Sequence, residues 1–212
     1  DRQALVGSAL EGHGEAASQN FPQGYFAYNP ELADRYAYDE RAARETLAAA
    51  GLPDGFTFTA GVMNLPENER IAQIVQQQLD AIGVTMQIRL LSPAEMSPVF
   101  NRGELDAVLT TFSGRADPSL LLTTYFAPDS PQNPSHDVTP GFAEALAAAN
   151  AEPDQQARGQ LLGEVSATVV DQALMIPLAF SDLGATLTDR VVGYQPYRAL
   201  DEWGGIGLTA AE

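Results

Sequence analysis

Cysteine, lysine and long hydrophobic runs are all missing from this 212-residue sequence. Without cysteine, the chain has no disulfides, no thiolate nucleophile and no metal site with cysteine ligands. No apolar segment reaches the roughly 18 residues that a membrane-spanning helix needs. The absence of lysine carries no chemical inference.

Positive charge is scarce. Eleven arginines stand against 28 acidic residues, which gives a formal net charge of −17. Such a chain repels polyanions, so we expect no nucleic-acid partner and no direct binding to an anionic membrane. The two histidines, His13 and His136, are far apart in sequence and have loop-forming neighbours. We therefore predict no metal site and no cofactor.

The remaining composition is that of an ordinary globular protein. Hydrophobic residues make up 45% of the chain and charged residues 18%, which excludes a disordered chain. The length suits one domain, or two small ones, with a sizeable core.

From Asp39 onward, helical and strand patterns alternate along the chain. The patterns predict helices over 39–51, 66–82 and 93–102, each followed by a strand, over 56–63, 84–90 and 105–112. Alternating strands and helices of this spacing favour a mostly parallel sheet flanked by helices, the α/β class.

The two flanks of this alternating region are less regular. Residues 1–38 have little periodicity, although residues 1–10 suit a short helix, and residues 127–140 form a proline-rich loop. Further helices are predicted after Asp117-Pro118 and over 142–151 and 155–171, a further strand over 175–180, and a strand and turn over 186–194. Gly159 and Gly163 form a GxxxG pattern, which we interpret as close packing in a helix of this polarity.

The loop that follows the strand over 105–112 is the strongest candidate site. Ligands of open α/β sheets bind outside the carboxyl ends of the strands. The candidate residues of this loop are Phe112, Ser113, Gly114, Arg115 and Asp117. Arg115 is a cation suited to a carboxylate or phosphate, and a surface ion pair is the structural alternative. Asp117 also stands where a helix N-cap belongs.

A second loop, after the strand over 56–63, occupies the equivalent place. Its candidates are Met63 and Asn64. No pattern of a catalytic serine, a phosphate-binding loop, a dinucleotide fold or a zinc protease occurs. The many acidic residues are interpreted as solvated charges near the ends of elements, so an enzyme is not expected.

Five segments of the chain together resemble one known family. They are DRQALV (1–6), YAYDERAARETLAAAGLPDGFTFT (36–59), IAQIVQQQLDAIGVTMQIRLL (71–91), GELDAVLTTFSGRADPSLL (103–121) and QARGQLLGEVSATVVDQALMIPLAF (156–180). In this order and spacing they are similar to the C-terminal part of peptide/nickel-type (family 5) solute-binding proteins of ABC importers, across essentially all 212 residues.

The resemblance implies one lobe of a two-lobed, periplasmic-binding-protein-like (type II) fold. Residues 1–212 are then a single, truncated C-terminal lobe, with Asp1 cutting a helix in the middle. Residues 1–38 partly span the lobes, and residues 196–212 return toward the missing first lobe. It also implies an extracytoplasmic protein that delivers a small solute to ABC permease subunits and meets the membrane only through a lipid anchor absent from this chain.

The nature of the solute stays open between a peptide-like and an anionic compound. In peptide binders of this family an acidic residue in the loop receives the peptide's amino group, whereas this chain has Arg115 near that place. Asp117 matches an Asp-Pro pair that opens the next helix. Two scattered histidines do not support nickel or haem transport. The alternative function is a sensor or chaperone-like protein that uses the same fold to bind a partner protein.

Overall fold

The computed structural model describes residues 1–112, 115, 117–130, 132–133, 140–182, 184–194 and 207–209. The predicted site residues Ser113 and Gly114, and most of the segment 196–212, lie outside this part of the chain. In the described part, no helix combines the length and apolarity that crossing a bilayer requires.

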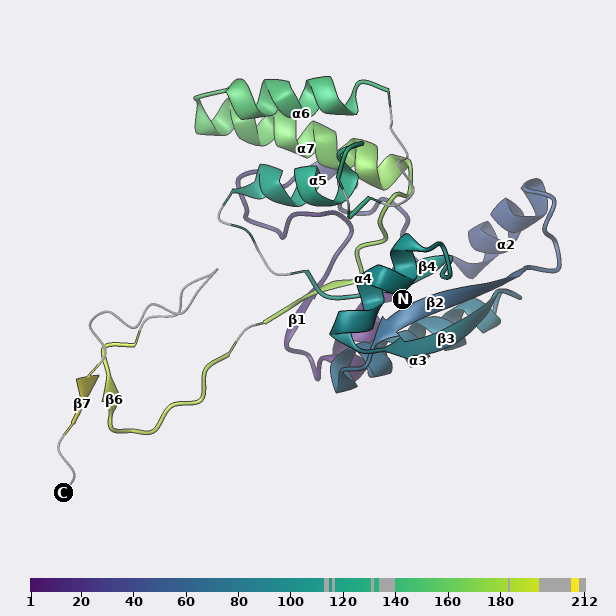
Figure 1. The fold of residues 1–212 in the computed structure, drawn as a ribbon, viewed down its shortest axis with the longest axis horizontal. Helices are drawn as coiled ribbons and strands as arrows, with labels where there is room; N and C mark the ends of the chain where they lie inside the picture. Colours follow the sequence, from purple (N-terminus) through teal and green to yellow (C-terminus); the bar gives the residue numbers. More distant parts are fainter. Residues whose placement is uncertain are drawn as a thin grey trace.

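The described helices and strands alternate through the middle of the chain (Figure 1). The helices are α1 (Arg2–Ala9), η1 (Pro30–Leu32, a 3-10 turn), α2 (Glu40–Ala49), α3 (Pro66–Asp80), α4 (Pro93–Asn101), α5 (Pro118–Phe126), α6 (Phe142–Ala151) and α7 (Gln155–Asp171). The strands are β1 (Gly14–Ala16), β2 (Thr57–Met63), β3 (Thr85–Leu91), β4 (Ala107–Leu109), β5 (Ala179–Ser181), β6 (Val191–Val192) and β7 (Gly207–Leu208).

A parallel sheet of order β3-β2-β4 forms the first layer of the molecule. The connection from β2 to β3 runs toward one edge of the sheet. The connection from β3 to β4 runs back past β2 toward the opposite edge. Since crossovers between parallel strands are as a rule right-handed, this reversal of direction places the two connecting helices on opposite faces of the sheet. Accordingly, α3 packs on Ala60, Val62 and Met86. On the other face, α4 packs its Met96 and Val99 with the strand residue Leu91. The predicted α/β class is confirmed.

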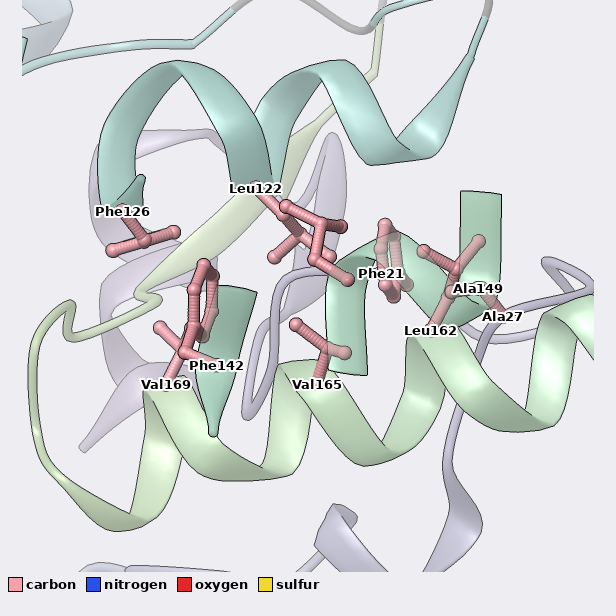
Figure 2. Close-up of a cluster of buried hydrophobic side chains, with 10 residues drawn as sticks. Phe21, Ala27, Leu122, Phe126, Phe142, Ala149, Leu162, Val165 and Val169 are labelled. Atoms are coloured by element: carbon pink, nitrogen blue, oxygen red, sulfur yellow. The ribbon is translucent and has the colours of Figure 1, made fainter. Parts of the chain in front are cut away.

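Helices α5, α6 and α7 form a second layer, in which helix packs on helix (Figure 1). Figure 2 shows its core, where side chains of all three helices meet Phe21 and Ala27 from the segment before η1. The buried members are Phe21, Ala27, Leu122, Phe126, Phe142, Leu146, Ala149, Leu162, Val165 and Val169. A stretch without regular periodicity thus supplies part of a helical core.

The two glycines of α7 allow this segment to approach the helix closely. A Cβ at Gly159 would overlap the carbonyl oxygen of Phe26, and one at Gly163 would lie 3.4 Å from the carbonyl oxygen of Ala27. The structure confirms the interpretation of the GxxxG pattern as close packing.

The strand predictions at the C-terminal side are confirmed only in part. Within 175–180, only residues 179 and 180 belong to a strand, β5, and it pairs antiparallel with β1 outside the parallel sheet. Pro177 has no backbone N–H to donate, and its carbonyl oxygen accepts the Arg2 Nε at 2.8 Å. Within 186–194, predicted as strand and turn, residues 189–190 form a turn and Val191–Val192 form a strand. The short helix expected within 1–10 is α1, and the rest of 1–38, expected to be irregular, contains β1 and η1.

The strand predicted over 105–112 is also shorter than expected. The side chain of Asp106 accepts the backbone N–H of Thr59 at 2.8 Å, in place of a backbone carbonyl, and Asp106 in turn donates its N–H to the Thr59 carbonyl at 3.0 Å. The regular register therefore starts one residue later, with Ala107 opposite Ala60.

Candidate functional site

The carboxyl ends of β2 and β4 lie side by side, at the point where the strand order reverses direction. In open α/β sheets, ligands bind in the crevice outside this reversal point. The fold therefore brings the two predicted loops, which begin at Met63 and at Phe112, to the same edge of the sheet.

The loop after β2 is short and opens α3 almost at once. The backbone N–H of Asn64 bonds to the carbonyl oxygen of Leu91 at 2.9 Å, which joins the loop to the end of β3. The Asn64 side chain is exposed, whereas Met63 packs with α4 residues below the sheet edge. Of these two predicted residues, Asn64 is the one placed to reach a ligand.

Asn68, in the first turn of α3, is a buried residue that the sequence reasoning missed. Its side chain is 2% exposed, and its Oδ1 accepts a hydrogen bond from the Thr111 hydroxyl at 3.2 Å. This bond ties the end of β4 to the start of α3. The Asn68 Nδ2 has no hydrogen-bond partner among the described residues. Nothing in the sequence distinguishes Asn68 from a solvated polar residue of a helix start.

Phe112 stands at the beginning of the loop after β4. Its ring packs against that of Tyr125 on α5, with the ring centroids 4.2 Å apart. The ring remains 36% exposed, so it offers an apolar surface at the sheet edge. Sequence spacing alone does not reveal its partner, because helical and strand patterns do not specify which elements meet across layers.

Asp117 lies at the far end of the same loop and caps α5. Its Oδ1 accepts the backbone N–H of Ser119 at 2.9 Å and the Ser119 hydroxyl at 2.7 Å. Both carboxylate oxygens also accept from Arg158 Nη2, at 2.8 and 2.9 Å. Partial burial raises the pKa of Asp117, but the Ser119 and Arg158 bonds outweigh it and lower the pKa below 3.8. The carboxylate is thus ionised and already occupied.

Arg115 differs from the other described arginines. Ten of the eleven arginines lie in the described part of the chain, and nine of them make a hydrogen bond or an ion pair with another described residue. Arg115 makes none with these residues, and its side chain is exposed. In a chain of net charge −17, an unpaired cation beside the sheet edge is a natural receptor for an anionic group.

Two hollows of the described surface lie away from the sheet edge. One, of about 270 Å³, is lined by residues that include Glu15, Gln19, Tyr28 and Phe180, beside the β1–β5 pair. A smaller one, of about 140 Å³, includes His13 and Arg70. Neither contains a predicted site residue. We place the candidate site at the sheet edge, because ligands of open α/β sheets bind outside the carboxyl ends of the strands.

The sequence matches the family model described as bacterial extracellular solute-binding proteins, family 5 Middle, over residues 1–133. The chain belongs to this family. Family membership confirms the resemblance deduced from the sequence and implies an extracytoplasmic location.

Individual relatives cover nearly the whole chain. The chain is 28% identical over 201 residues to the probable di/tripeptide-binding protein 5 of Pseudomonas aeruginosa, covering 92% of this chain and 38% of that protein. It is also 28% identical over 202 residues to heme-binding protein A of Haemophilus influenzae, covering 92% of this chain and 37% of that protein. The chain thus spans less than two-fifths of the length of these two relatives.

Solved structures confirm the type II fold. HbpA2 from Haemophilus parasuis superposes with a TM-score of 0.82 at 27% identity, covering 99% of this chain and 43% of that one. The periplasmic binding protein DppA from Helicobacter pylori, in complex with the peptide STSA, gives a TM-score of 0.82 at 24% identity, covering 98% and 42%. At 24% identity, the comparison with DppA supports only the similarity of the fold.

Proposed function

We propose that this chain forms the solute-contacting lobe of a non-catalytic, extracytoplasmic binding protein, which captures a small solute with an anionic group and delivers it to the permease of an ABC importer. A short peptide, whose C-terminus is a carboxylate, is one such solute. A lipid anchor outside this chain would hold the protein at the membrane.

Arg115, which has no hydrogen-bond or ion-pair partner among the described residues, is the observation that carries the choice of solute class. It lies in the loop between β4 and α5, at the sheet edge where β2 also ends. The carboxylate of Asp117, the acid nearest in the loop, is occupied by Ser119 and Arg158. The loop therefore offers a cation to a carboxylate and no free carboxylate of Asp117 to an amine.

Calorimetry on the complete protein that contains this chain tests the proposal with three matched probes. These are alanyl-alanine, its N-acetyl derivative, which lacks the amine, and its C-terminal amide, which lacks the carboxylate. We expect the N-acetyl derivative to bind at least as well as the parent dipeptide and the amide to bind more weakly, because the carboxylate is the group that Arg115 receives.

Arg115→Ala should weaken binding of the two carboxylate probes by about 1.5–3 kcal/mol, the usual range for a hydrogen-bonded charged group. The matched control is Arg41→Ala, which removes the same charge from α2, where Arg41 pairs with Glu45 on the exposed surface. An unchanged affinity in the Arg115 variant, or an equal loss in both variants, would contradict a direct role for Arg115.

A further inference from the structure

Arg158, in the first turn of α7, joins all three helices of the second layer. Its Nη2 bonds to both carboxylate oxygens of Asp117, which caps α5, and its Nε donates to the carbonyl oxygen of Ala149 in the last turn of α6 at 3.2 Å. The Arg158 side chain is only 21% exposed. A rigid, planar guanidinium can make these bonds at once, which the point charge of a lysine cannot.

Both ends of the loop that carries Arg115 contact helices of the second layer. Phe112 packs its ring on Tyr125 of α5, and Asp117 is held by Arg158 of α7. Arg115 lies three residues after Phe112 and two residues before Asp117. The position of Arg115 relative to the sheet edge is therefore set by the helical layer as well as by β4.

We propose that Arg158 is a positioning residue for solute binding, which acts through Asp117 to hold the β4–α5 loop, and with it Arg115, ready for the solute. This inference rests on the proposed function. A loop that is fixed before binding does not have to be ordered at the moment of binding, and that ordering otherwise weakens affinity. Arg158 itself need not touch the solute.

Three variants of the complete protein isolate this role. Arg158→Gln removes the positive charge and the planar guanidinium group. Asp117→Asn removes the charge while keeping a good N-cap residue, so α5 keeps its start even if Arg158→Gln folds poorly. The third variant combines both changes. The control, Arg35→Gln, breaks another arginine–aspartate pair, at the far end of α7, where Arg35 Nη2 lies 2.6 Å from Asp171 Oδ1.

Two measurements are made on each variant. Amide hydrogen exchange without solute reports on residues 110–119, and calorimetry with N-acetyl-alanyl-alanine gives the affinity. We expect both single variants to speed exchange in 110–119 and to weaken binding about tenfold, or about 1.4 kcal/mol. The double variant should match the singles, because interacting partners are not additive. Arg35→Gln should change neither quantity.

Unchanged exchange in 110–119, or faster exchange with unchanged affinity, would overturn the positioning role, as would additive losses in the double variant. If the probe does not bind the parent protein, the proposed function fails for this solute class. Exchange in 110–119 still decides, in that case, whether Arg158 holds the loop.

Discussion

The sheet layer and the helical layer of this molecule are stabilised in different ways. The three strands of the parallel sheet and the helices α3 and α4 on its two faces come from one continuous stretch, 57–109, and α1 packs beside α3. The helical layer joins α5, α6 and α7 to Phe21 and Ala27, which lie far earlier in the sequence. The loop between β4 and α5 connects the two layers. The sheet layer places this loop at the carboxyl ends of the strands, and the helical layer supplies Arg158, which pairs with Asp117.

The largest effect is expected from the core of the helical layer. Leu162→Ala removes a side chain that is 0% exposed, and deleting a buried leucine side chain costs about 2–5 kcal/mol. Urea unfolding followed by circular dichroism measures the loss. If the two layers differ as described, amide exchange should rise more in α5–α7 than in β2 and β3.

The control for this variant is Leu120→Ala on α5, where the leucine is 51% exposed. A surface change of this kind is expected to stay within about 0.5 kcal/mol. Similar losses in the two variants would show that the cluster around Leu162 is not the core of the helical layer.

Replacing glycine by alanine should change the stability in opposite directions at two positions, one in each layer. Gly159→Ala places a methyl group against the Phe26 carbonyl, and overpacking of this kind costs about 1–3 kcal/mol. Gly7, in α1, has open space around it, so Gly7→Ala should stabilise by up to about 1 kcal/mol. Thermal unfolding of both variants gives the two signs, and stabilisation by Gly159→Ala would contradict the close approach at α7.

A smaller effect, on acid stability, is expected from the ion pair beside the loop. The folded-state pKa of Asp117 lies below 3.8, its ordinary value. The stability that its ionised form contributes is therefore present above 3.8 and is lost as the pH falls through the folded pKa. Asp117→Asn cannot be protonated, so its Tm should be lower than that of the parent at neutral pH and approach it in acid. A Tm difference that does not change with pH would show that Asp117 contributes nothing through its charge.

Much of the fold could be predicted from the sequence because its signals are local. Asp39, which accepts the backbone N–H of Ala42 at 2.9 Å, and the Ser92–Glu95 capping box begin helices where the sequence predicts them. The ends of the strands could not be predicted in the same way. Asp106 accepts a hydrogen bond with its side chain where a backbone carbonyl would do so in a regular strand. The carbonyl oxygen of Pro177 bonds to Arg2, 175 residues away.

The candidate site was predictable in place but not in its contacts. The rule that ligands bind at the carboxyl ends of strands led to the loops at Met63 and Phe112 without knowledge of the strand order. The partner of Asp117 is 41 residues away, and no spacing rule connects an N-cap to an arginine of another helix. The direct contact of each predicted residue with a solute stays a prediction.

A structure of the complete protein with its bound solute tests the central claim most directly. The account predicts a solute at the carboxyl ends of β2 and β4, with an anionic group within hydrogen-bond reach of the Arg115 guanidinium and with Asp117 still paired to Arg158. A solute in the hollow beside the β1–β5 pair, or one that leaves Arg115 uncontacted, would contradict it.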